Sequence, residues 1–162
     1  MTSLLTLKGD SMDNLDKRIL EELQLDSRKS FTKIAQKIGV STATVSDRVK
    51  KLTEKGIICS YTTTLNTSEI GMVTLISKIK IKQEYNIEEV GKEMAEIEAS
   101  CCVHHVTGDF DLLVISKCIG HGKCGFIIEK LKEIAGVERV DSELVLKTLK
   151  EELNVKLSCD DI

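Results

Sequence analysis

The stretch from Thr42 to Lys51 carries hydroxyl, methyl, carboxylate and ammonium groups at helical spacing, a set suited to recognising duplex DNA. Val45, Val49 and Leu52 would form the inward stripe of such a helix. Hydroxyls can bond several base edges, methyl groups can touch the thymine methyl, and lysines suit phosphates. The opposite side therefore supplies the candidate DNA contacts, which are Thr42, Ala43, Thr44, Ser46, Asp47, Arg48, Lys50 and Lys51.

Two charged residues of this helix have alternative roles. Asp47 either accepts a hydrogen bond from cytosine N4 or repels wrong placements near phosphate. Arg48 lies next to the buried stripe, so it makes either a structural ion pair with the first helix or a phosphate contact.

A second group of candidates lies in the segment Thr107–Asp111, with the sequence TGDFD. An α-amino acid needs acceptors for its ammonium group and donors for its carboxylate. Asp109 or Asp111 could accept from the ammonium, and backbone N–H groups around Gly108 could donate to the carboxylate. A plain hairpin turn, with Asp111 as a local cap, accounts for the same residues.

The six cysteines lack Cys-x-x-Cys spacing, so reduced thiols are expected, with a disulfide as the alternative. Zinc or copper would accept soft ligands at the spacing of Cys118, His121 and Cys124. Further donors lie on the preceding strand, at Cys101, Cys102, His104 and His105. Neighbours on a strand point to opposite faces, so at most half of these converge. Free cysteine is also a common core residue, and no metal or cofactor is expected.

Three helices must position the candidate DNA contacts. Apolar spacing predicts helices over residues 14–24, 31–38 and 42–55, the last two capped by serine at positions 30 and 41. Only three residues, including Gly39, separate the second and third helices, which is typical of a helix-turn-helix. In that motif the third helix would enter the major groove. The β-branched stretch Ile57–Leu65 is expected to form a wing strand.

The distribution of charged residues also separates the front of the chain from the rest. The net charge is −3, but residues 1–66 hold eleven Lys or Arg against eight Asp or Glu. Within residues 28–55 the counts are eight and two. This asymmetry predicts a polyanion-binding front domain joined to an acidic partner domain.

The second domain reads as strand, helix, strand, strand, helix, strand, the split pattern of a ferredoxin-like sheet. Alternation over residues 72–82 predicts the first strand and Leu112–Ile115 a continuous apolar one. Both helices would cover one sheet face. Leu144, Leu146 and alternating residues of the first strand are expected to supply apolar material to the other face, favouring sheet-to-sheet dimerisation.

Several segments together resemble the Lrp/AsnC (leucine-responsive, or feast/famine) regulators. They cover about residues 13–150 in the family's order, namely Leu15–Leu20 (LDKRIL), Ser41–Val49 (STATVSDRV), Gly56–Ile58 (GII), Thr107–Asp111 (TGDFD) and Gly136–Val137. The chain departs from the family at Cys101-Cys102, where a proline often precedes the valine, and at Ser142, where threonine is common.

The resemblance implies an α+β protein: a winged helix-turn-helix DNA-binding domain and a ferredoxin-like βαββαβ regulatory domain. Expected boundaries are an extension at 1–12, the DNA-binding domain at 13–66, a hinge at 67–71, the regulatory domain at 72–150 and a tail at 151–162. The implied effector is an amino acid bound between regulatory domains by Thr107, Gly108, Asp109, Phe110, Asp111 and Ser142.

The expected partners are double-stranded DNA, further copies of the chain in dimers, tetramers or octamers, and a free amino acid. No apolar run approaches the roughly 18 residues of a membrane span, and no enzyme motif occurs, so a cytoplasmic, non-enzymatic transcription regulator is expected. The alternatives are a ligand-independent autoregulator or chromatin-packing protein, and a thiol- or metal-responsive regulator of the same fold.

Overall fold

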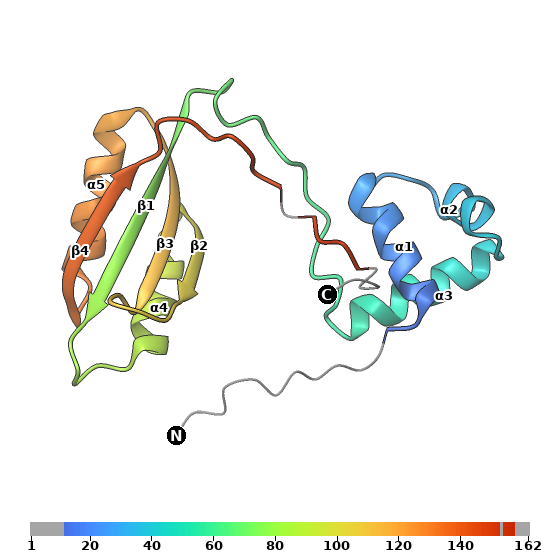
Figure 1. Ribbon diagram of the computed structural model, residues 1–162, viewed down its shortest axis with the longest axis horizontal. Helices are drawn as coiled ribbons and strands as arrows, with labels where there is room; N and C mark the ends of the chain where they lie inside the picture. Colours follow the sequence, from blue (N-terminus) through green and yellow to red (C-terminus); the bar gives the residue numbers. More distant parts are fainter. Residues whose placement is uncertain (1–11, 153, 158–162) are drawn as a thin grey trace. The chain divides into compact units, whose positions relative to one another are not determined.

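The computed structural model describes residues 12–152 and 154–157, which divide into two compact units (Figure 1). Of these, residues 12–64, 152 and 154–157 belong to the first unit, and Leu65–Glu151 is the second. The extension expected at 1–12 lies, apart from Met12, outside the described residues. Among the described helices, none is long and apolar enough to cross a membrane.

The first unit contains the three predicted helices, α1 (Asn14–Leu25), α2 (Phe31–Ile38) and α3 (Thr42–Glu54). A side chain caps the start of each by accepting a backbone N–H bond: Asp13, Ser30 and Ser41. The turn between α2 and α3 is sharp because Gly39 adopts φ +77°, a left-handed conformation that glycine tolerates without strain. The helix-turn-helix prediction is therefore confirmed.

Apolar side chains from all three helices form the core of this unit, including Ile19, Ile34 and Val45, each fully buried. Glu22 of α1 is also buried, with Lys29 and Lys37 paired to its carboxylate. Hydrogen bonds from these two ammonium groups, Lys29 foremost, hold the pKa of Glu22 below its ordinary value against the opposing effect of burial. The buried charge is thus paired.

The wing strand expected over Ile57–Leu65 is not formed; this segment has no strand in the structure. A strand must share its backbone hydrogen bonds with a neighbouring strand. Among the described residues of the first unit, no second strand lies alongside to provide those bonds. High β-propensity was therefore insufficient to form the wing.

The described part of the tail packs on α1 rather than standing apart. The side-chain amide of Gln24 accepts from the Val155 N–H at 2.8 Å and donates to the Val155 carbonyl at 3.1 Å. Asn154 donates from Nδ2 to the Gln24 carbonyl at 3.3 Å, which serves an otherwise unpaired group at the end of the helix. The chain thus crosses between the units twice along its sequence.

The second unit is a four-stranded antiparallel sheet with two helices. Its order along the chain is β1 (Met72–Ile81), α4 (Ile87–Ala95), β2 (Ser100–His105), β3 (Leu112–Ile119), α5 (His121–Glu133) and β4 (Val137–Leu144). The strands lie side by side as β2-β3-β1-β4, and each neighbouring pair is antiparallel. This topology confirms the predicted ferredoxin-like fold.

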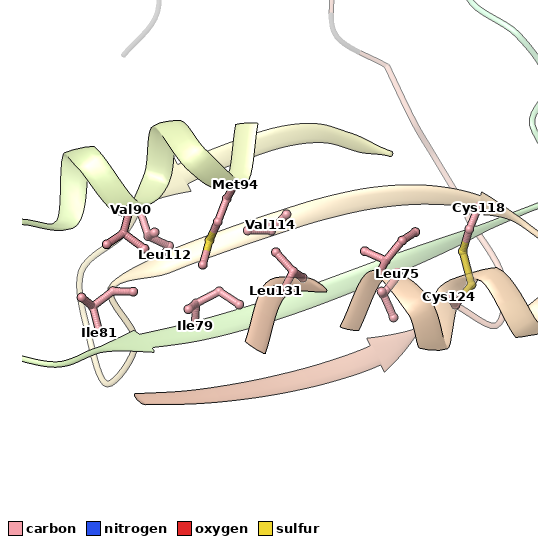
Figure 2. Packing of buried hydrophobic residues seen from close by; sticks show 11 residues of the cluster. Leu75, Ile79, Ile81, Val90, Met94, Leu112, Val114, Cys118, Cys124 and Leu131 are labelled. Carbon is pink, nitrogen blue, oxygen red and sulfur yellow. A yellow bond between two sulfur atoms is a disulfide. The ribbon is translucent and has the colours of Figure 1, made fainter. Parts of the chain in front are cut away.

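The core of the second unit lies between the sheet and the two helices, which cover the same face (Figures 1 and 2). Leu75 and Ile79 of β1 meet Met94 of α4 and Leu131 of α5 there. The strand predicted at Leu112–Ile115 is the first half of β3; although its residues are all apolar, their burial alternates, with Val114 fully buried and Ile115 half-buried. Only one of its faces lies under the helices.

The apolar material of the uncovered sheet face differs from the prediction. Leu144 lies opposite Leu75 in the β1–β4 register and so shares its helix-covered side, while Leu146 follows β4 and is fully exposed. The uncovered face instead carries apolar side chains from the two central strands, set among lysines: Ile76, Leu113, Ile115, Lys78, Lys80 and Lys117. Strand register, which fixes these faces, is a non-local property.

Cys118 and Cys124 form a disulfide, so the expectation of reduced thiols throughout is wrong (Figure 2). The bond joins the end of β3 to the second turn of α5, and both cysteines are buried. The structure brings their Cα atoms to 5.8 Å, within bonding range of a disulfide. Cys59, Cys101 and Cys102 are free thiols.

Candidate DNA-binding surface and regulatory loop

The helix α3 presents one polar, exposed face and buries the other. Val45, Val49 and Leu52 are buried in the first unit, as predicted. Six of the eight predicted contact residues are exposed on the remaining surface: Thr42, Ala43, Ser46, Asp47, Lys50 and Lys51. The face combines small hydroxyl and methyl groups near the helix start with ammonium groups nearer its end, an arrangement suited to bases and phosphates respectively.

Thr44 is partly committed to the helix itself. Its hydroxyl lies 2.8 Å from the Ser41 hydroxyl, and its backbone N–H donates to Ser41 Oγ at 3.0 Å. The side chain is half-buried. A base contact by this threonine would have to share its hydroxyl with the N-cap.

Arg48 makes the structural ion pair that was one of its two predicted roles. Its guanidinium bonds the carboxylates of Asp13 and Asp16 at the start of α1, the latter at 3.1 Å. Those two acids also form a reciprocal capping box. The backbone N–H of Asp16 and then the Arg48 guanidinium hold the pKa of Asp13 below its ordinary value, and the same pairing raises the pKa of Arg48. This cluster joins α3 to α1.

The loop Thr107–Asp111 connects β2 to β3, and Asp111 is anchored within it. The Asp111 carboxylate accepts from the Ile81 backbone N–H at 2.8 Å and from Lys80 Nζ at 3.1 Å. Burial opposes its ionisation, but these two bonds outweigh burial and hold its pKa below the ordinary value. Because β3 begins only at Leu112, this carboxylate supplies the partner that Ile81 would otherwise lack.

The rest of the loop is open to solvent. Thr107, Gly108 and Asp109 are exposed, and Gly108 adopts φ +113°. The Phe110 ring lies under the guanidinium of Arg139 from β4, 4.9 Å from its centroid. An exposed carboxylate, turn amides and a nearby guanidinium are thus gathered in one region, a combination able to bind a small zwitterion.

Ser142 is not part of this group within the unit. It lies opposite Ser77, and the two hydroxyls are 2.8 Å apart. Asp111 bonds Ile81 instead, four residues farther along β1, which corresponds to roughly 13 Å of strand. The structure therefore separates Ser142 from the other predicted effector residues.

The soft-ligand set weighed as an alternative from the sequence loses two members to the disulfide, since Cys118 and Cys124 are bonded to each other. Cys102 and His104 point to the uncovered side of the sheet, opposite Ile115 and Leu113 in register. Across the described part of the chain, no three His, Cys, Asp or Glu side chains gather as a metal site.

Sequence reasoning missed Lys80 and Arg139, the two cations beside the loop. Neither residue has a functional role in the prediction from the sequence. The two residues lie opposite each other in the β1–β4 register. Their proximity depends on pairing between strands far apart in the chain, and no local pattern signals it.

Comparison with known proteins is consistent across both units. The model of the AsnC-type helix-turn-helix domain matches residues 12–53, and that of the Lrp/AsnC ligand binding domain matches residues 74–155. An uncharacterized HTH-type transcriptional regulator of Pyrococcus abyssi is 35% identical over 146 residues, covering 90% of this chain and 99% of that protein. The HTH-type transcriptional regulator Ptr1 of Methanocaldococcus jannaschii is 33% identical, covering 86% and 95%.

Solved structures share the fold at lower identity. AsnC of E. coli superposes with a TM-score of 0.79 at 22% identity, covering 90% of this chain and 99% of that one. A transcriptional regulator of Neisseria meningitidis, solved as a complex with L-Met, gives 0.81 at 20% identity, covering 91% and 98%. Both family models match, and the relatives align over nearly their whole length. This chain therefore belongs to the Lrp/AsnC family of transcriptional regulators, with a DNA-binding and a ligand-binding domain.

Proposed function

We propose that this regulator reads pseudo-palindromic duplex DNA as a dimer or larger assembly, with α3 of each protomer in a major groove. The observation that carries the proposal is the exposed polar face of α3, set on a buried apolar stripe. Two copies related by a twofold axis would present two such helices to two half-sites.

The residues of that face take different roles. Thr42, Ala43 and Ser46 lie in the amino-terminal part of α3, the part that meets base edges in this motif. Lys50 and Lys51 contact phosphates, since both are exposed toward the carboxyl end of the helix. Asp47 lies between these two groups and discriminates by accepting from cytosine or repelling phosphate. Thr44 makes a secondary contact through its shared hydroxyl.

In this proposal Arg48 serves the interface indirectly. Its ion pairs with α1 hold the reading helix against the rest of the unit, so the helix reaches DNA already oriented. Preorganisation of this kind lowers the ordering cost of binding. Arg48 is thus a positioning residue rather than a phosphate contact.

Assembly through the uncovered sheet face supports the same arrangement. That face displays Ile76, Leu113 and Ile115, all half-buried in the single chain. A second copy packed sheet to sheet would remove them from water. The three lysines around them already pair with carboxylates of their own chain, Glu143, Asp111 and Glu151, so packing a second copy there would not bury unpaired ammonium groups.

An amino acid is the proposed effector, bound at the loop Thr107–Asp111. Asp109 is the better acceptor for its ammonium group, because the Asp111 carboxylate already serves Ile81 and Lys80. Arg139 is close enough to Phe110 to stack on it and is a candidate partner for the ligand carboxylate. Binding of L-Met by the Neisseria relative supports this ligand class. A thermal-shift screen of the twenty amino acids tests it, since a bound ligand raises stability; no shift would favour a ligand-independent regulator.

The DNA-binding proposal is tested by the salt dependence of affinity. The double variant Lys50→Ala/Lys51→Ala removes four phosphate contacts per dimer, so the slope of log K against log salt should flatten by about three to four. The measurement is fluorescence anisotropy of a labelled promoter duplex at several salt concentrations.

The matched control is Lys92→Ala/Lys147→Ala, which removes the same charge from exposed positions in the second unit. The slope of log K against log salt for this variant should differ from that of wild type by less than about one, because charges far from the DNA release few counterions. An equal flattening by both variants would show that net charge, and not the α3 surface, governs affinity.

A further inference from the structure

We propose that the Cys118–Cys124 disulfide is a redox-responsive lock on the end of the regulatory unit that carries both chain connections to the DNA-binding unit. Figure 2 shows the bond at one end of the core, linking β3 to α5. Both half-cystines are at most 4% exposed. The lock is independent of the effector loop, which lies at the opposite end of β3.

The position of the bond follows from the strand register. Cys118 lies opposite Val73 at the start of β1, and Ile119 lies opposite Met72. This is where the chain coming from the DNA-binding unit enters the sheet. The disulfide therefore fixes the first paired residues after the connecting segment.

Lys117, next to the disulfide, holds both connecting segments. Its Nζ lies 3.5 Å from Thr67 Oγ1, just before β1, and 2.8 Å from both carboxylate oxygens of Glu151, just before the chain returns to the first unit. The Lys117 side chain is only 15% exposed. Loosening this end of β3 would thus affect the incoming and the outgoing connection together.

The start of α5 is weak without the bond. Its N-cap is Gly120, which provides no side-chain cap, whereas Asn86 caps α4 with two hydrogen bonds. Gly122 and Gly125 follow in its first turns and are poor helix formers. Packing does not require either glycine, because a Cβ at each would meet nothing within 4 Å. The helix start therefore depends on its covalent link to β3.

The switching chemistry is dithiol–disulfide exchange with a cellular or added dithiol. A thiolate of the reductant attacks one sulfur and forms a mixed disulfide, and its second thiol then closes the reductant's own disulfide. Cys118 and Cys124 leave as two thiols, having gained two electrons and two protons. Burial shields the bond, so attack requires the glycine-rich start of α5 to open first.

Hydrogen exchange on the full-length protein tests the lock directly. Thiol titration should find one disulfide in protein treated with oxidised glutathione and none after dithiothreitol. Reduction should raise exchange across residues 119–126 by roughly tenfold or more, with little change in α4, because the bond restricts the open state. Six titratable thiols after oxidation, or equal exchange in both states, would overturn the proposal.

Variants separate the lock from the other thiols. Cys118→Ser/Cys124→Ser should exchange like reduced wild type under all conditions, while Cys101→Ser/Cys102→Ser should keep the full redox response. Gly122→Ala/Gly125→Ala strengthens the helix start and should remove most of the exchange difference. An undiminished difference in this variant would refute the role assigned to the weak helix start.

The functional consequence rests on the proposed DNA binding. Reduction should change the affinity for the promoter duplex by about fivefold or more, which is the lower end of the range for coupled sites. The affinity of the double serine variant should not depend on the redox state. Unchanged affinity with altered exchange would refute the coupling and leave the proposed function standing. Absence of DNA binding in both redox states would refute the proposed function. The hydrogen-exchange experiment would then still test the redox lock by itself.

Discussion

Replacing Asp111 tests its structural role in the loop between β2 and β3. Its carboxylate holds two partners, the Ile81 N–H at 2.8 Å and Lys80 Nζ at 3.1 Å, and Ile81 itself is 4% exposed. Asp111→Ala would leave that N–H without its partner at the end of β1. Asp111→Asn keeps an acceptor of the same size but removes the charge.

The magnitudes follow from the bonds lost. A hydrogen bond to a charged group contributes about 1.5–3 kcal/mol, and a neutral one about 0.5–1.5. Asp111→Ala should therefore destabilise the second unit by about 2 kcal/mol, and Asp111→Asn by about 1 kcal/mol. For a domain of this size, 2 kcal/mol corresponds to a decrease in Tm of roughly 8–16 °C.

The pH dependence has a definite sign. Because the folded pKa of Asp111 lies below its unfolded value of about 3.9, the ionised carboxylate contributes its full stability above that value. The contribution is lost as pH falls through the folded pKa. The stability gap between wild type and Asp111→Asn should thus be constant from about pH 7 to pH 5 and shrink below about pH 4.

Urea unfolding followed by circular dichroism, at several pH values, measures these differences. Asp109→Asn is the matched control, because Asp109 is exposed in the same loop; its stability should stay within about 0.5 kcal/mol of wild type. If Asp111→Ala were as stable as the control, the anchoring role would be wrong. A gap that widened in acid would show that the pKa shift has the opposite sign.

Three further changes probe other contacts. Arg48→Gln should lower the free energy of unfolding at neutral pH. It should also reduce the loss of stability in acid, because the folded pKa of Asp13 rises without the guanidinium. Urea unfolding at pH 7 and pH 3 measures both effects. Gly136→Ala places a Cβ 2.5 Å from the Tyr85 ring at φ +89° and should cost more than about 1 kcal/mol, with partial recovery in a double variant that also carries Tyr85→Ala. No recovery would assign the cost to the backbone alone. Ser41→Ala removes the N-cap of α3 and should cost about 1 kcal/mol in chemical unfolding, so an unchanged midpoint would contradict the capping role.

Local structure was predictable because its causes are local. The caps at Ser30 and Ser41 and the turn at Gly39 depend on residues only a few positions apart. Apolar periodicity likewise determined which side of α3 is buried, and so which residues are exposed as candidate DNA contacts. The order and spacing of the elements and motifs were sufficient to predict the two-domain fold and the family.

Tertiary structure decided what depends on pairing between distant segments. The sequence left Arg48 with two possible partners, and only the packing of α1 against α3 selected its ion pairs. Strand register placed Leu144 on the helix-covered face and Ser142 away from the effector loop. The disulfide was also beyond local reasoning, since the approach of Cys118 to a residue on α5 is fixed by how that helix packs on the sheet. Sequence periodicity determines faces within an element, whereas contacts between elements depend on register and packing, which no single segment encodes.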